Sequence, residues 1–214
     1  MRVEAIPAWI AGTNAYLAIG DDNTAVLVDA PPDPRPIGEH IASRGVAVVG
    51  ILLTHGHVDH TGGAGQLAAS TGAGVWAHPD DDFLTLHPEE QVRLMYGQLL
   101  PGSYEVPGEF QRLAHGQLLE LAGLSLEVRH TPGHTPGHCC FYDKAEGVLF
   151  SGDQLFRGSV GRADLPGGSW PDLMTSMRQH VMTLDDDVRV FPGHGPETTI
   201  GAERRTNPFR DEWV

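Results

Sequence analysis

Apolar residues recur along the chain in short runs that end at glycine, proline or acidic residues. Residues 14–19 and 24–29 carry alternating apolar positions on either side of the polar cluster Gly20-Asp21-Asp22-Asn23, a pattern typical of a β-hairpin. Residues 46–53 form a continuous apolar run with the length of a buried strand. The remaining runs predict shorter strands at residues 75–77, 118–121, 124–129, 138–142, 147–150 and 188–191.

Helical periodicity occupies several of the gaps between these strands. Helices are predicted at residues 37–43, 62–69 and 170–182. In the third of these, Leu173, Met177 and Val181 share one face, and Ser169 is a candidate N-cap. Residues 80–114 carry mixed signals; the triplet Asp80-Asp81-Asp82 could start a helix, but we assign no role to this stretch. Strands in two groups with helices between them predict a layered α/β domain.

The length and charge of the chain limit its partners and its class. With 214 residues and no repeat or linker, residues 1–214 are expected to form a single domain. The 14 basic and 28 acidic residues give a formal charge of −14, which argues against a nucleic-acid partner. The sequence lacks a run near 18 apolar residues and a secretory signal, so we expect no membrane partner and a cytoplasmic location.

The two cysteines are neighbours, Cys139 and Cys140. Adjacent cysteines rarely form a disulfide because the geometry is strained. We therefore expect two small residues of a buried strand rather than a redox pair.

Histidine is abundant, with 12 in the chain, and four potential ligands cluster directly after the apolar run 46–53. His55, His57, Asp59 and His60 lie within six positions in a loop that a rigid strand would hold in place. Imidazole and carboxylate groups are suitable ligands for zinc, iron, manganese or cobalt.

Three more residues of these types follow later apolar runs, each beside glycine or proline: His134, Asp153 and His194. A single histidine after a strand is usually a hydrogen-bonded loop residue, and a single aspartate after glycine usually caps a turn. Seven such residues at strand ends form a joint pattern that predicts a site for two metal ions.

The motif Thr54-His55-x-His57-x-Asp59-His60, together with these three residues, resembles the metallo-β-lactamase fold superfamily. Residues 152–164 and the tail from residue 192 to residue 209 resemble its small glyoxalase-II-like hydrolases. The resemblance implies an α/β fold, a four-layer αβ/βα sandwich in which helices flank two mixed β-sheets. It also implies two divalent metal ions, with zinc favoured over iron or manganese. One metal would be held by His55, His57 and His134, the second by Asp59, His60 and His194, and Asp153 would bridge them.

By the same resemblance, the chain is a hydrolase that cleaves small-molecule thioesters, of the S-2-hydroxyacyl-thiol type cleaved by glyoxalase II, with a metal-bound hydroxide. Asp59 would orient the nucleophile or take its proton. Arg162 would contact the substrate, although pairing with Asp164 is an equal alternative. His130 and His138, which flank His134, are expected to support the ligands or the fold rather than bind metal.

The sequence departs from classical glyoxalase II in two ways. We expect no C-terminal glutathione-binding helical domain, and Gly195-Pro196 stands where the classical enzyme presents a tyrosine to its substrate. Both departures weaken the case for S-lactoylglutathione as the substrate. The alternatives within the fold are a persulfide dioxygenase with a single iron and a lactonase. The sequence does not indicate an oligomeric state.

Overall fold

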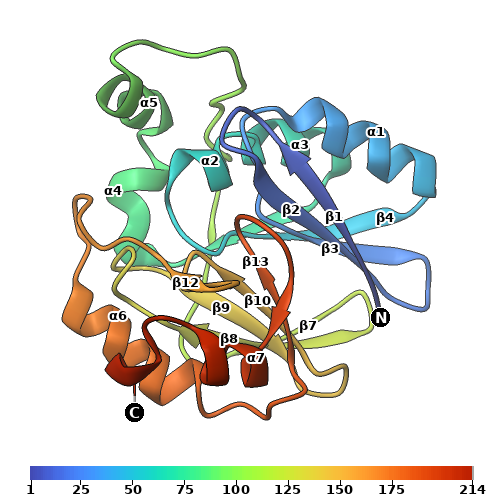
Figure 1. The fold of residues 1–214 in the computed structure, drawn as a ribbon. Helices are drawn as coiled ribbons and strands as arrows, with labels where there is room; N and C mark the ends of the chain where they lie inside the picture. Colours follow the sequence, from blue (N-terminus) through green and yellow to red (C-terminus); the bar gives the residue numbers. More distant parts are fainter. Residues whose placement is uncertain (214) are drawn as a thin grey trace.

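The computed structural model describes residues 1–213, which form two mixed β-sheets packed face to face (Figure 1). The first sheet contains, in spatial order, β1 (Arg2–Ala8), β2 (Thr13–Ile19), β3 (Thr24–Val28), β4 (Ala47–Leu52), β5 (Gly74–Ala77) and β6 (Gln111–Arg112). The second contains β14 (Thr198–Thr199), β13 (Arg189–Pro192), β10 (Val148–Gly152), β9 (Cys139–Asp143), β8 (Leu124–His130) and β7 (Leu118–Leu121). Both sheets combine parallel and antiparallel pairs.

Helices cover the outer faces of both sheets. In Figure 1, α1 (Pro34–Arg44) and α3 (Ala64–Thr71) lie on the first sheet, and α6 (Trp170–Ser176) and α7 (Ile200–Thr206) lie on the second. A π-helical turn continues α6 over Met177–Val181, and Ser169 caps its start by accepting a hydrogen bond from the main-chain nitrogen of Asp172. The expected four-layer αβ/βα sandwich is therefore confirmed.

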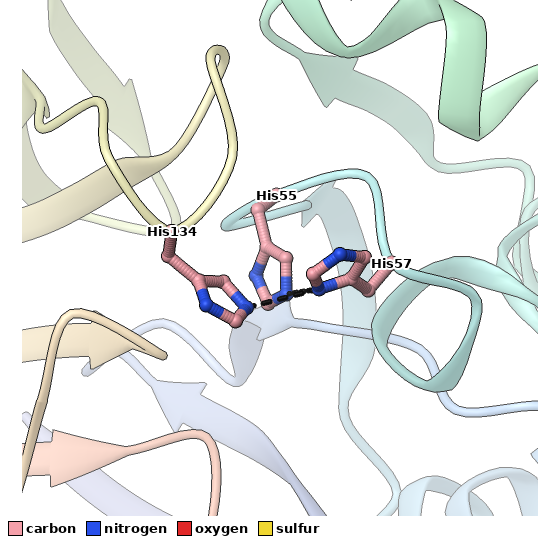
Figure 2. Close-up of side chains that lie close together, drawn as sticks. All are labelled: His55, His57 and His134. Atoms are coloured by element: carbon pink, nitrogen blue, oxygen red, sulfur yellow. Dashed lines mark hydrogen bonds between the residues drawn. The ribbon is translucent and has the colours of Figure 1, made fainter. Parts of the chain in front are cut away.

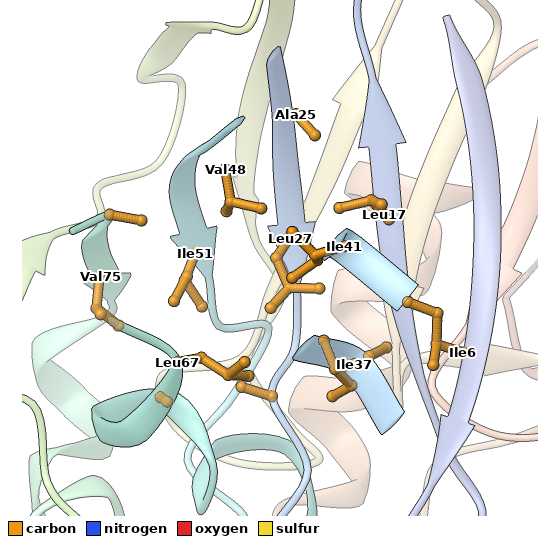
Figure 3. Packing of buried hydrophobic residues seen from close by; sticks show 14 of the residues in the cluster. Ile6, Leu17, Ala25, Leu27, Ile37, Ile41, Val48, Ile51, Leu67 and Val75 are labelled. Atoms are coloured by element: carbon orange, nitrogen blue, oxygen red, sulfur yellow. The ribbon is translucent and has the colours of Figure 1, made fainter. Parts of the chain in front are cut away.

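Three hydrophobic clusters separate the four layers. The first lies between α1, α3 and the first sheet, where Ile37, Ile41 and Leu67 pack on Leu27 and Ile51 (Figure 3). The second fills the space between the two sheets, and the third lies between the second sheet and its helices. Burial of these apolar side chains provides the main favourable term for folding.

The strands contribute to two clusters at once because successive side chains point to opposite faces. The neighbouring cysteines show this clearly, since Cys139 packs between the sheets and Cys140 packs toward the helices of the second sheet. Both thiols are free and buried, and burial raises the pKa of Cys140 to about 12. They serve as small core residues of β9.

Several elements lie outside the predicted set. The strand β1, the helix α7 and the four-residue helix α2 (Val58–Thr61) were not predicted, and neither were the two-residue strands β6, β14, β11 (Leu155–Phe156) and β12 (Ser159–Val160). The two-residue strands carry too few positions for a periodic pattern, and their pairing partners determine them instead. In the sequence, β1 and α7 were missed although each has seven residues.

The unassigned stretch 80–114 contains α4 (Asp82–Thr85), α5 (Pro88–Tyr96) and the edge strand β6. Single-turn 3₁₀ helices occur at Pro79–Asp81 and Arg210–Glu212. In Figure 1, α4 and α5 lie beside α2, on the opposite side of the molecule from α1. Among residues 1–213, no helix combines the length and the apolar character needed to cross a bilayer.

Candidate metal centre

Four segments that follow strands meet at one edge of the sandwich. The segment after β4 carries His55, His57, Asp59 and His60, and the loop between β8 and β9 carries His134. The ends of β10 and β13 lead to Asp153 and His194. The structure thus brings all seven predicted residues into one cluster. Within it, the potential ligand atoms lie within 4.8 Å of one another in three overlapping groups: His55, His57 and His134; Asp59, His60 and His194; and His55, His60 and Asp153.

The first group consists of three imidazoles that converge on one point (Figure 2). Nδ1 of His57 lies 3.1 Å from Nε2 of His55 and 2.9 Å from Nε2 of His134. Burial lowers the pKa of His55 and His57, and neighbouring histidines lower it further, to about 3 for His57. Neutral imidazoles present lone pairs, which are the form that binds metal.

The second group consists of Asp59, His60 and His194. Nε2 of His194 lies 3.2 Å from Oδ2 of Asp59 and 3.3 Å from Nε2 of His60. Burial lowers the pKa of His60, but the carboxylates of Asp153, Asp59 and Asp29 outweigh it and raise this pKa well above its usual value. Unlike the first group, the second contains a carboxylate, and it lies against the carboxylates of Asp29 and Asp153.

Asp153 lies between the two groups. Its Oδ2 is 3.6 Å from Nε2 of His134 and 3.5 Å from Nε2 of His194, and its Oδ1 is 3.3 Å from Nε2 of His60. Burial would raise the pKa of this carboxyl, but His60, His134 and His194 hold it below its usual range. A charged carboxylate in this position is within reach of both groups.

Three independent observations indicate that these side chains are suited to bind cations. Oδ1 of Asp153 is buried without a hydrogen-bond partner, which is costly unless a cation compensates it. Nδ1 of His134 donates to the carbonyl oxygen of Arg162 at 2.7 Å, so Nε2 is the nitrogen that faces the centre. Nδ1 of His60 is held in the same way by a carboxylate of Asp29 at 2.7 Å. Metal-binding histidines usually have their second nitrogen held in this way.

Asp29 is one of three supporting residues that the sequence reasoning missed. Its Oδ1 accepts hydrogen bonds from the main-chain nitrogen of Thr54 at 2.8 Å and from Oγ1 of Thr54 at 3.0 Å. It has a φ of 62°, a left-handed conformation that aspartate tolerates better than most residues. Its place at the end of a predicted strand was the available signal, because the seven predicted ligands also follow strands.

Asp81 is the second missed residue, and it joins two ligand loops. One carboxylate oxygen accepts from the main-chain nitrogen of Gly56 at 2.7 Å and from Oγ1 of Thr135 at 2.6 Å. The other accepts from the main-chain nitrogen of Gly137 at 2.6 Å. The loop that carries His55 and His57 is thereby tied to the loop that carries His134.

Thr13 is the third, and it donates from Oγ1 to Oδ2 of Asp59 at 2.9 Å. His138 also touches the site, since its Nε2 accepts a hydrogen bond from the main-chain nitrogen of Asp153 at 3.1 Å. Nε2 of His130 is bonded instead to the carbonyl oxygen of Pro136 at 2.8 Å. Neither His130 nor His138 belongs to the groups formed by the seven predicted ligands.

Arg162 supports the site through its main chain. Its guanidinium forms two hydrogen bonds with Asp164, at 2.7 and 2.8 Å, and both side chains are exposed. The pair lowers the pKa of Asp164 to about 2. This geometry matches the alternative that the sequence left open, and only the Arg162 carbonyl contacts a predicted ligand.

Known proteins match this chain over nearly its full length. The sequence model described as the metallo-beta-lactamase superfamily matches residues 9–194. Hydroxyacylglutathione hydrolase GloC of Haemophilus influenzae is 36% identical over 210 residues, or 98% of each chain. The crystal structure of the BLEG-1 B3 metallo-beta-lactamase has a TM-score of 0.90 at 32% identity and covers 98% of this chain and 99% of its own. The structure of TTHA1623 in a di-iron-bound form has a TM-score of 0.86 at 38% identity and covers 97% of this chain and 100% of its own.

Proposed function

The chain belongs to the metallo-beta-lactamase superfamily, and from that premise we propose that it is a thioesterase acting on small acyl thioesters. At the coarser level it is a metal-dependent hydrolase of this superfamily, with His and Asp clusters that fit a binuclear metal site. The similarity to hydroxyacylglutathione hydrolase GloC over 98% of both chains supports the choice of a thioester among the substrates of such hydrolases.

The position of Asp153 is the observation that carries the proposal. Its carboxylate lies within 3.6 Å of ligand nitrogens from both groups, and one oxygen is buried without a hydrogen-bond partner. A carboxylate shared in this way suits two cations rather than one. A bound pair of divalent cations would supply an activated water at neutral pH and would polarise the substrate carbonyl.

The protein groups have separate roles in this mechanism. Asp59 orients the attacking water and accepts its proton at Oδ1, because Thr13 and His194 both contact Oδ2. His194 is the most exposed of the seven residues, with 31% of its side chain exposed, so the leaving thiol departs on that side. The other six residues are more deeply buried, which keeps bulk water away from the rest of the centre.

The metal pair is proposed to be zinc, iron or manganese, because imidazole and carboxylate ligands accept all three. The relative solved in a di-iron-bound form makes iron as strong a candidate as zinc. The three groups formed by the seven predicted ligands contain no cysteine. Without a thiolate, the donor set does not favour zinc over iron.

Metal analysis of the purified protein, followed by assays with thioesters, lactones and a glutathione persulfide, tests the proposal. We expect two metal ions per chain and thioester cleavage without oxygen consumption. Asp153→Asn should lose metal and activity together, whereas Asp164→Asn, which alters an exposed carboxylate beside the site, should keep both.

Two results would replace the proposed function. One iron per chain with oxygen uptake on the persulfide would identify a dioxygenase. Turnover of lactones with no turnover of thioesters would identify a lactonase. Full metal occupancy in Asp153→Asn would overturn the bridging role of this residue.

A further inference from the structure

An apolar cavity of about 270 Å³ adjoins the metal centre at His57. It lies between α4, α5 and the loop that follows Arg162, and its other lining residues are Leu84, Gln91, Leu94, Met95, Leu165 and Pro166. Its size is near the lower end of small-molecule sites in proteins. It therefore suits one substituent of a substrate rather than a whole cofactor.

The one amide in the lining has no free polar atom to offer a ligand. Oε1 of Gln91 accepts from the main-chain nitrogen of Val58 at 3.1 Å. Its Nε2 donates to the carbonyl oxygens of Gly56 and Leu84, at 3.0 and 2.8 Å. Apart from His57, the cavity wall thus presents hydrocarbon to whatever enters it.

Apolar side chains on α5 are left open to solvent at this cavity. Leu94 is 77% exposed and Met95 is 44% exposed, although both line it. Clustered exposed apolar side chains often mark a binding site. An apolar ligand would remove this surface from water, with a gain that grows with each methylene group.

The arginines near this region are already paired with carboxylates. Arg93 contacts Glu89, Arg112 contacts Asp82, and Arg162 contacts Asp164. Among the lining residues, none is a lysine or an arginine. A substituent bearing a carboxylate would therefore enter the cavity without a partner for its charge, at a cost in binding.

We infer that this cavity binds an uncharged aliphatic acyl group of the substrate, and the inference rests on the proposed thioesterase function. The acyl side of the thioester is preferred because the cavity adjoins His57, whereas the thiol departs past the exposed His194. The substrate class is thus a short acyl thioester without charge on its acyl chain.

The test measures kcat/KM of the metal-loaded protein on N-acetylcysteamine thioesters with acetyl, butyryl and hexanoyl groups. We expect a rise on the order of fourfold per added methylene until the cavity is filled. Succinyl thioester, which matches butyryl in length but carries a carboxylate, should be at least tenfold slower than butyryl. A second series, with acetyl fixed and the thiol lengthened, should show no such rise.

Substitution of a cavity residue provides a second test, with a matched control outside the cavity. Met95→Glu should reduce the hexanoyl-to-acetyl ratio at least tenfold. Leu118→Glu, at an exposed leucine that is 61% exposed on β7, should leave that ratio and both rates unchanged.

Binding provides a readout that does not depend on turnover. The binding probe is a ketone analogue of the hexanoyl thioester, in which CH₂ replaces the sulfur. In methyl-labelled protein, this ketone should shift the methyl resonance of Met95. The Met95→Leu variant assigns that resonance. Equal kcat/KM along the acyl series with no shift at Met95 would overturn the inference while leaving the thioesterase proposal intact. A rise along the thiol series alone would also overturn it. If no thioester is cleaved, the proposed function fails, and the Met95 resonance still decides whether the cavity binds the chain.

Discussion

The Nδ1 atom of His60 lies 2.7 Å from Oδ2 of Asp29, and both side chains are buried. Because Asp29 also accepts two hydrogen bonds from Thr54, its carboxylate is fixed at the end of β3. The contact turns Nε2 of His60 toward Asp59 and Asp153. A residue outside the ligand set thereby determines how a ligand faces the centre.

Replacing Asp29 should weaken metal binding at the second group. Asp29→Ala removes the acceptor that holds Nδ1 of His60, and loss of such partners usually costs 10–100-fold in metal affinity, which we expect here on the order of 10-fold or more. Metal titration by calorimetry measures the change. Asp22→Ala, at an exposed turn carboxylate that bonds Thr24, is the control and should leave the affinity unchanged. Equal affinities in the two variants would contradict the role of Asp29.

Replacing Asp81 should destabilise the fold and separate two ligand loops. Asp81→Ala leaves the buried donors of Gly56, Thr135 and Gly137 without an acceptor, at a cost of about 3 kcal/mol or more in the free energy of unfolding. Chemical denaturation measures this quantity. Asp80→Ala removes the neighbouring carboxylate, whose side chain is 56% exposed, and should cost less than about 0.5 kcal/mol.

Gly133 should tolerate no side chain. Its φ is 138°, and a Cβ there would lie 2.2 Å from the main-chain nitrogen of Leu173 at the start of α6. Gly133→Ala is therefore expected to destabilise the protein by more than about 2 kcal/mol. Gly116→Ala is the comparison, because Gly116 also has a positive φ but open space around it. That variant should cost about 1 kcal/mol, and equal losses in the two variants would show that the clash is relieved.

Removal of metal should lower thermal stability. The centre buries the carboxylates of Asp59 and Asp153 together, and cations bound to the folded state stabilise it by mass action. A free metal concentration about 1,000 times the Kd contributes about 4 kcal/mol, which corresponds to a fall of roughly 8–16 °C in Tm when a chelator removes it. Differential scanning calorimetry with and without chelator measures the change. An unchanged Tm would mean that the centre holds no metal under these conditions.

The amino-acid sequence determined the main strands and the chemistry of the centre. The run 46–53 corresponds to β4, and the periodicity of Leu173, Met177 and Val181 corresponds to α6 and its π-helical continuation. The types of the seven candidate ligands, and their positions after strands, were readable because both features are local. Two-residue strands such as β11 and β12 were not readable, because only a pairing partner defines them.

Only the tertiary structure decided which distant residues support the site and which surface borders it. Asp29 and Asp81 act through partners that lie 25 to 56 positions away, and local patterns carry no information on such contacts. The cavity at His57 arises because α4 and α5, from a stretch with mixed sequence signals, pack beside the loop that holds Leu165. Hydrophobic burial is non-directional, so the sequence specified only that burial of these apolar residues is favourable. The packing of the whole chain determined which of them remain exposed beside the metal centre.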